Sequence, residues 1–453
     1  MYEGGFVFFR YLARQASDFT IENQTANKTI QTFYGNDTIN NTGSHVTITS
    51  GAGDDSIINT NRGGALSLAG SYSYIEAGAG NDYVLNQAYA DYSFVDGGAG
   101  DDSIDNRAAG STIYGGAGND SIYNITSRVS INGGKGNDSI DHGGDQVTII
   151  GGKGNDSIQS FGDKVKITGD AGNDYVLLWA NAMNHTVSGG DGKDSIYSGG
   201  TNVSVNAGAG NDYIHLYSNA VDNTVIGGKG NDSVMSYNKN GVLYKYGNGD
   251  GKDTITGFSA TDTLSIADVS FSTKASGSDL LVKVGKGSVL LKGAKKLTAN
   301  VVLSASNSAN SSLTLSSTVK NVDASKRTKA IQVTGNKLDN SITGGAKNDV
   351  LYGGAGNDTL WGGTGNDTLY GDAGADKFIY AAGDGKDVIY GLDNSDMLLI
   401  TGAFSASYNK SNDAIYFKVG STKNALTLKD YTATSFNING INYKVSGTKL
   451  VRK

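Results

Sequence analysis

Apolar residues in this chain recur in short alternating runs, separated by polar turns that are rich in glycine. The blocks NRAAGSTIY, NITSRVSIN, HGGDQVTII and SFGDKVKIT each end in such a run. Alternation with a period of two is typical of a half-buried β-strand. The pattern therefore predicts a succession of very short strands, each with one face toward a core.

These runs belong to a repeat. The block GGKGNDSI at 133–140 returns at 151–158, with a different block between the two copies. The aspartate that is sixth in each block recurs at intervals of 18 to 27 residues, at Asp55, Asp82, Asp102, Asp120, Asp138, Asp156, Asp174, Asp194, Asp212, Asp232 and Asp253. A second array steps by 9, at Asp349, Asp358, Asp367 and Asp376. A short fixed period predicts stacked coils.

The glycine blocks have the chemistry of a cation site. Paired glycines permit a left-handed backbone in a tight turn and leave carbonyl oxygens uncovered, and the aspartate adds a carboxylate. Calcium prefers six to eight oxygen ligands, so two stacked turns, such as those of Asp138 and Asp156, could enclose an ion. The alternative is a solenoid of ordinary turns without metal. It would stack carboxylates about 5 Å apart along one edge, which is unfavourable unless a cation lies among them.

The blocks GGAGDDSI at 97–104, GGAGNDSI at 115–122, GGKGNDSI at 133–140 and 151–158, GDAGNDYV at 169–176, GGKGNDSV at 227–234, GGAGNDTL at 353–360 and GGTGNDTL at 362–369 resemble the RTX family of calcium-binding nonapeptide repeats. The resemblance covers most of residues 50–255 and 335–400. It implies a parallel β-roll that binds several Ca²⁺ ions through the sixth-position aspartates and through backbone carbonyls of the turns, represented by Gly116, Gly118, Gly134, Gly136, Gly152, Gly154, Gly354, Gly356, Gly363 and Gly365. Lys347 and Asn340 depart from the pattern, which makes the sites at their two blocks doubtful.

We therefore expect an all-β fold: a parallel β-roll, or β-solenoid, with two rolls that are each closed by a small β-rich cap. GDGKDTI and LVKVGKGSVLLKG recur as GDGKDVI and YFKVGSTKNALTLKD, so a roll followed by a cap occurs twice. The expected parts are an N-terminal strand or cap (1–31), a long roll of 18–20-residue coils with calcium turns on one edge (32–256), a β-cap (257–296), a linker with the first coils of the next roll (297–334), a short two-edged roll (335–390) and a C-terminal β-cap and tail (391–453).

The coils whose aspartate precedes Tyr83, Tyr175 or Tyr213 are two residues longer than the others. We expect the extra residues to bulge on the metal-free edge, with the three tyrosines on the outer face covering the bulge or its neighbours.

Composition narrows the functional classes. The 453 residues include 66 glycines, no proline and no cysteine, which fits a parallel ladder and excludes disulfides and thiolate sites. The net charge of −7 with scattered basic residues argues against nucleic-acid binding, and no apolar run is long enough for a transmembrane helix. The four histidines are dispersed and expected at the surface. Without an HExxH or GxSxG motif, no catalytic constellation supports an enzyme.

The sequence predicts a secreted, extracellular bacterial protein without enzymatic activity, whose rolls fold when they bind external calcium. The family resemblance implies type I secretion. One alternative is an adhesin, associated with the cell surface, that binds a glycan or protein partner on the variable edge. Another is the repeat module of a larger exoenzyme. Ice binding is disfavoured because no Thr-x-Thr ladder repeats along the coils.

Overall fold

The computed structural model describes residues 18–60, 72–88, 90–179, 183–238, 240–266, 271–294, 302–305, 312–315 and 319–453. All regular elements in these ranges are β-strands, and the strands divide between two compact units, residues 1–194 and 195–453. The predicted all-β parallel solenoid is confirmed. The proposed domain boundaries stay a prediction. Residues 1–17 of the N-terminal cap and parts of the 297–334 linker lie outside the described residues.

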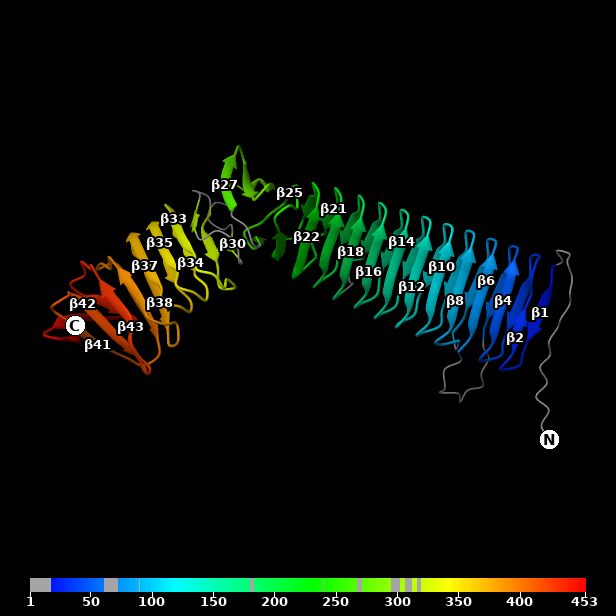
Figure 1. The fold of residues 1–453 in the computed structure, drawn as a ribbon, viewed down its shortest axis with the longest axis horizontal. Helices are drawn as coiled ribbons and strands as arrows, with labels where there is room; N and C mark the ends of the chain where they lie inside the picture. The colour runs from blue at the N-terminus through cyan, green and yellow to red at the C-terminus, as the bar shows by residue number, and fades with distance from the viewer. Residues whose placement is uncertain are drawn as a thin grey trace, which may run out of the picture. The chain divides into compact units, whose positions relative to one another are not determined.

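In the first unit every coil contributes one strand to each of two parallel sheets. Figure 1 shows the even-numbered strands side by side. One sheet contains β1 (Thr20–Asn23), β3 (Thr38–Asn41), β5 (Ser56–Asn59), β7 (Tyr83–Asn86), β9 (Ser103–Asn106), β11 (Ser121–Asn124), β13 (Ser139–His142), β15 (Ser157–Ser160) and β17 (Tyr175–Leu178). The other contains β2 (Thr29–Gln31), β4 (Thr47–Ala52), β6 (Tyr74–Ala79), β8 (Phe94–Ala99), β10 (Thr112–Ala117), β12 (Ser130–Lys135), β14 (Thr148–Lys153), β16 (Lys166–Ala171) and β18 (Thr186–Asp191).

The second unit begins with the same two-sheet arrangement. Its odd strands are β19 (Ser195–Ser198), β21 (Tyr213–Leu216), β23 (Ser233–Ser236) and β25 (Lys252–Thr256), and its even strands are β20 (Ser204–Ala209), β22 (Asn223–Lys229), β24 (Val242–Tyr246) and β26 (Thr263–Ile266). An antiparallel set follows, made of β27 (Phe271–Ser276), β28 (Asp279–Val284) and β29 (Gly287–Lys292), and β29 pairs in parallel with β25.

The later strands of this unit repeat the plan. One parallel row contains β30 (Val302–Ala305), β32 (Asn321–Asp323), β34 (Ser341–Thr343), β36 (Thr359–Trp361), β38 (Lys377–Ala381), β40 (Met397–Thr401) and β44 (Phe436–Ile438). The other contains β31 (Ser312–Thr314), β33 (Gln332–Asn336), β35 (Val350–Ala355), β37 (Thr368–Ala373), β39 (Asp387–Tyr390) and β43 (Thr422–Lys429). Antiparallel strands β41 (Phe404–Asn409), β42 (Ala414–Val419), β45 (Ile441–Ser446) and β46 (Lys449–Arg452) complete it.

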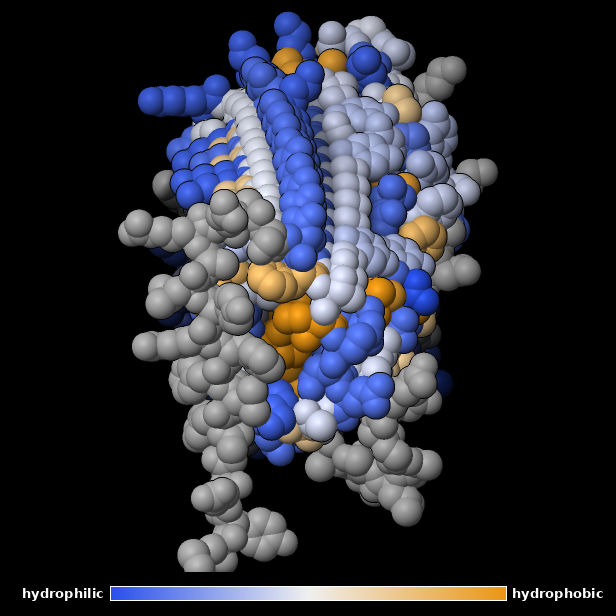
Figure 2. Space-filling view, turned by 90° about the vertical axis from the view of Figure 1, so that its right-hand side faces the viewer, coloured by the Kyte–Doolittle hydropathy of each residue, from blue (hydrophilic) through white to orange (hydrophobic). Residues whose placement is uncertain are grey.

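The core of the first unit is a stack of mainly aliphatic side chains from successive strands. Ile104, Ile122 and Ile140 follow one another in register in the odd sheet, and each is at most 1% exposed. Because adjacent strands pair without a shift, residues at one position of the coil form a continuous row along the roll. Figure 2 shows such rows as stripes of similar hydropathy. The repeat thus places every copy of a functional residue on the same line.

A second buried row lies at the edge opposite the glycine turns. The Nδ2 group of each asparagine donates to Oδ1 of the next, from Asn23 through Asn41, Asn59, Asn86 and Asn106 to Asn124, over 2.6–2.8 Å. Asn124 Nδ2 then lies 2.9 Å from Nδ1 of His142, whose Nε2 faces the carbonyl of Gly144. The predicted surface placement is wrong for His142 and His185, which are 1% and 2% exposed, because the coil turns them inward.

The longer coils carry their extra residues at this same edge. The connection from β7 to β8 runs from Asn86 to Phe94, two residues longer than that from Asn106 to Thr112 between β9 and β10. Tyr83, which opens β7, lies on the outer face, 39% exposed, at the end of the strand away from that connection.

Replacement of Asn106 by alanine should destabilise the folded protein. It leaves Asn86 Nδ2 and Asn124 Oδ1 without their ladder partner, and one buried unsatisfied group costs about 1–3 kcal/mol. Urea unfolding measures the change. Asn132→Ala, at an outward position of β12, is the control and should cost well under half as much. Equal effects of the two variants would contradict a structural role for the ladder.

Candidate metal centre

The glycine turns adopt the left-handed backbone that the repeat predicts. All ten glycines named as carbonyl donors have φ between +88° and +145°. Asp170 and Asp372, which replace the second glycine of their blocks, also have positive φ, at 83° and 66°. The glycines also permit close stacking. A methyl group on Gly116 would collide with the carbonyl oxygen of Gly98 in the preceding coil.

The sixth-position aspartates form a buried ladder along these turns. The backbone N–H of each donates to Oδ1 of the next, over 2.7–3.0 Å, from Asp37 to Asp194 in the first unit and from Asp212 to Asp253 in the second. In the second array the same bond joins every second block, so that Asp349 N–H donates to Oδ1 of Asp367, and Asp358 N–H donates to Oδ1 of Asp376. Each coil is therefore tied to its neighbour by one carboxylate oxygen.

The second oxygen of most of these carboxylates has no hydrogen-bond partner. Buried Oδ2 atoms of this kind belong to Asp37, Asp55, Asp82, Asp102, Asp120, Asp138, Asp156, Asp174, Asp232, Asp358 and Asp367. A row of desolvated acceptors without donors is costly unless something positive faces it.

A carbonyl oxygen of the next coil lies beside this unpartnered atom. A methyl group on Gly133 would collide with Asp138 Oδ2 and would lie 2.6 Å from the carbonyl oxygen of Gly151. The strand pairing of β12 with β14 also skips these two glycines, since it runs from Asn132↔Ile150 directly to Gly134↔Gly152. A carboxylate oxygen and a carbonyl oxygen thus converge where only glycine fits. This all-oxygen donor set suits Ca²⁺.

Burial raises the pKa of these carboxyls. Desolvation is the largest cause throughout, and hydrogen bonds from the preceding backbone partly oppose it. Neighbouring aspartates add like-charge repulsion, and the pKa reaches about 6 for Asp82, Asp156, Asp232 and Asp358, and about 7 for Asp102, Asp120, Asp174, Asp367 and Asp376. The folded chain therefore resists ionisation of the side chains that a cation would need.

Two blocks that depart from the repeat have a different environment. Both oxygens of Asp349 accept backbone hydrogen bonds, from Ile331 N at 2.8 Å and Gly345 N at 2.6 Å. Asn340 Nδ2 donates to the carbonyl of Lys320 at 2.9 Å. Both side chains thus already have backbone partners.

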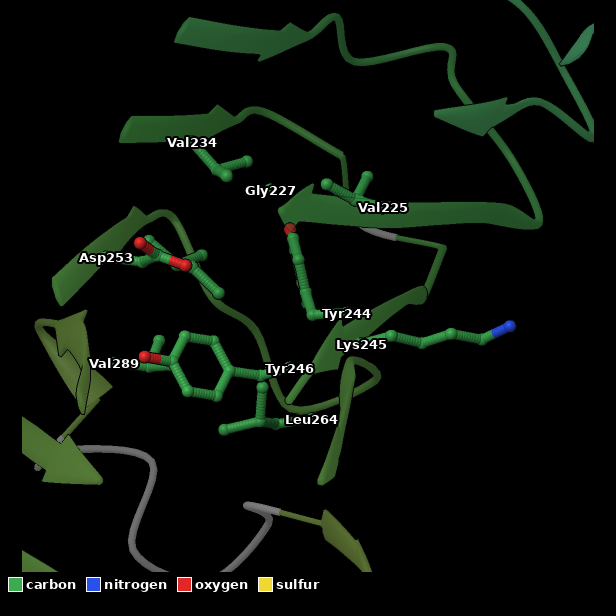
Figure 3. Close-up of a pocket in the computed structure, with 10 residues that line it drawn as sticks. Val225, Gly227, Val234, Tyr244, Lys245, Tyr246, Asp253, Leu264 and Val289 are labelled. Carbon is green, nitrogen blue, oxygen red and sulfur yellow. The ribbon is translucent and has the colours of Figure 1, made fainter. Parts of the chain in front are cut away.

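Two of the aspartate rows end beside a buried tyrosine. The hydroxyl of Tyr246 donates to the carbonyl of Gly251 at 2.5 Å, and Tyr380 donates to that of Gly385 at 2.8 Å. Asp253 and Asp387 lie near these rings, and burial raises the pKa of each to about 8. Figure 3 shows Asp253 and Tyr246 beside a cavity of about 20 Å³, while Lys245 points away. That volume holds about one water molecule.

Sequence reasoning missed three members of the rows, Asp37, Asp387 and Asp396, the last of which accepts the N–H of Asp376 at 2.8 Å. Asp37 has the same buried, unpartnered Oδ2 as its successors, and its block YGNDTI at 34–39 has a single glycine. Asp387 accepts the N–H of Asp367 as Asp253 accepts that of Asp232. The match of GDGKDVI with GDGKDTI was the signal that could have identified it.

Within the described ranges, no three His, Cys, Asp or Glu side chains cluster as a metal site would require. A cation at these turns would therefore depend on backbone carbonyls for most of its ligands. In the same ranges, no helix is long and apolar enough to cross a membrane.

Comparison with known proteins identifies the repeats. A family model described as the RTX calcium-binding nonapeptide repeat matches residues 87–108, 109–124, 127–148, 148–176, 188–220, 217–236, 334–369, 343–378, 356–384 and 379–399. A solved structure of a hyperactive, Ca²⁺-dependent, β-helical antifreeze protein from an Antarctic bacterium is 18% identical, with a TM-score of 0.30 over 81% of this chain and 84% of that one. No curated protein matches the chain.

The raised pKa values predict that acid stabilises the calcium-free protein. A carboxyl with a folded pKa of about 6 to 8, against about 3.9 when unfolded, adds stability as the pH falls through its folded value. Without calcium the far-UV β-signal should recover as the pH falls from 8 to 5. The lowered pKa values of buried His142 and His185 oppose this only below about pH 6.5. A calcium-free β-signal that falls steadily from pH 8 to pH 6.5 would contradict this picture of the turns.

Proposed function

Because this chain carries RTX calcium-binding nonapeptide repeats, we propose that it is a secreted protein whose rolls fold on binding extracellular Ca²⁺. The observation that carries the proposal is the row of buried aspartates, eleven of which, among the residues that the structure describes, have one carboxylate oxygen without a hydrogen-bond partner. We assign ligation to these oxygens and to the carbonyls of the glycine turns. Asp349 is the weakest candidate, since both of its oxygens are already bonded.

The buried aspartates determine whether the coiled or the extended state of the chain is favoured. Without a cation, the aspartates of successive coils place desolvated carboxylates in one line, and the coiled state is disfavoured relative to an extended chain. A bound Ca²⁺ would supply positive charge and would be coordinated by the carboxylate oxygens that have no hydrogen-bond donor. The ligand oxygens come together only when two coils stack. The free energy of calcium binding therefore adds to the stability of the folded state.

Composition supports an extracellular role in structure rather than catalysis. The chain has no cysteine, so disulfides cannot stabilise it outside the cell, and metal cross-links could take their place. Its two roll-and-cap copies would make a repetitive scaffold, and type I secretion fits the repeat family. An exoenzyme containing these repeats stays a prediction, and the adhesin alternative depends on a binding surface, which is treated below.

Circular dichroism in calcium and in EGTA tests the proposal. The far-UV β-signal and the melting transition of the full chain should be present in millimolar CaCl₂, largely lost in excess EGTA and restored by added Ca²⁺. Magnesium at equal concentration is the control and should restore much less, because it requires stricter octahedral geometry and dehydrates reluctantly. An unchanged β-spectrum in EGTA at neutral pH would reject folding on calcium.

The variant Asp138→Asn separates charge from hydrogen bonding. Asparagine keeps an acceptor for Asp120 N–H but removes a buried carboxylate beside Gly133. The variant should therefore keep more far-UV β-signal than wild type in EGTA at pH 8 and melt lower in calcium, with fewer ions bound. Asp141→Asn, on the outward face of the next strand, is the matched control and should shift neither value. A change of the same sign in both conditions would contradict ligation by Asp138.

A further inference from the structure

Aromatic rings gather on the outer face of the second unit. They come from β19 and β21 and from the residues that directly follow β21 and β23, and we call Tyr197, Tyr213, His215, Tyr217 and Tyr237 the ring cluster. His215 lies at its centre, 4.6 Å from the ring of Tyr217, 5.4 Å from Tyr237 and 5.6 Å from Tyr197, centroid to centroid. All members belong to one unit.

Strand register explains the gathering. Tyr197, His215 and Met235 occupy one outward row, because β19, β21 and β23 pair without a shift. Tyr213 opens β21 on the same face, and its hydroxyl lies 3.2 Å from Nδ1 of His215. Elsewhere in this sheet a strand carries at most one outward ring, such as Tyr83 in β7 and Tyr123 in β11. Two outward rings on one strand occur only in β21 among the described strands of this sheet.

Several rings of the cluster are exposed to solvent. Tyr237 is 57% exposed and Tyr217 is 40% exposed. The stack of Tyr352, Tyr370 and Tyr390 differs, because its rings lie nearly parallel, 4.7 and 5.0 Å apart, and cover one another's faces. In the ring cluster the planes of His215 and of Tyr217 and Tyr237 are inclined by 42° and 36°, which leaves ring faces open to a ligand.

Charge and area limit what can bind there. The outward residues of the three strands are Ser195, Tyr197, Tyr213, His215, Ser233 and Met235, and none is an acid, a lysine or an arginine. Burial lowers the pKa of His215, so its ring is neutral at pH 7. Five partly exposed rings offer on the order of 400 Å², about half of the 800 Å² that each partner buries in a stable protein interface. The surface fits a small, uncharged ligand.

We propose that the ring cluster binds a neutral carbohydrate, with pyranose rings stacked on Tyr217 and Tyr237. A sugar with equatorial hydroxyls presents C–H groups to an aromatic face and hydroxyls to its rim. The rim here carries Ser195, Ser233 and the tyrosine hydroxyls, which can exchange hydrogen bonds with those hydroxyls. The inference goes beyond calcium-dependent folding, since it gives the folded roll a partner.

Titration of the calcium-loaded full chain with cellohexaose, xylohexaose and mannohexaose tests this, with alginate as an anionic probe. We expect at least one neutral hexaose to bind and alginate not to bind. Tyr237→Ala should weaken binding at least tenfold, and Tyr237→Phe, which keeps the ring, should stay within about threefold of wild type. Tyr370→Ala, which removes an outward tyrosine of the parallel stack, is the matched control and should not change the affinity.

Circular dichroism in calcium must first show that each variant is folded, so that failure of sugar binding is distinguished from failure of folding. No binding of the three neutral sugars by the folded chain overturns the proposal, and so does equal loss in Tyr237→Ala and Tyr370→Ala. Self-association that Tyr237→Ala abolishes, without sugar binding, would assign the ring cluster to a second copy of this chain and would also overturn it.

Discussion

The structure depends on one hydrogen bond, repeated at every glycine turn: the N–H of an aspartate donates to the carboxylate of the aspartate one coil further on. This bond fixes the register of the coils, and it also turns each carboxylate inward. Its cost is a second oxygen that is buried without a donor. The hydrogen bond that aligns the coils therefore also leaves a buried carboxylate oxygen without a donor. Such an oxygen needs a positive charge beside it, which is a stronger reason to expect a cation here than the presence of acidic residues alone.

The two edges of the long roll carry buried side chains with different hydrogen-bonding groups. An asparagine amide contains both a donor and an acceptor, so each asparagine from Asn41 to Asn106 donates a hydrogen bond to the asparagine of the next coil. A carboxylate has only acceptors, so the side chains of Asp120 and Asp138 cannot hydrogen-bond to each other in this way. Because the two rows lie at opposite ends of the same strands, one edge holds together without metal while the other requires it. This asymmetry follows from the hydrogen-bonding capacity of the two kinds of side chain.

Much of this arrangement is readable from the sequence because the repeat is strict. A period of eighteen residues fixes which aspartates share a line, and the glycines mark where the backbone is left-handed. The asparagine row was not predicted, since an asparagine at the end of a short strand reads as an ordinary turn residue until the strands are placed in register. The burial of His142 was missed for the same reason. Tyr246 and Tyr380 were unremarkable in the sequence, and only the coil brings their hydroxyls to the last glycine carbonyls.

The ring cluster shows what such a scaffold leaves free to vary. Inward positions are constrained by the core and by the buried rows, and glycines are constrained by the close approach of neighbouring carbonyls. The outward positions of a strand carry no such requirement, so Ser139 and Asp141 in one coil can be replaced by Tyr213 and His215 in another without a change of register. Residues on adjacent coils are then about one strand spacing apart, and a few substitutions are enough to build a continuous surface. Stability and recognition are thus separated within each coil: the inward and turn positions hold the roll together, and the outward positions can acquire a ligand.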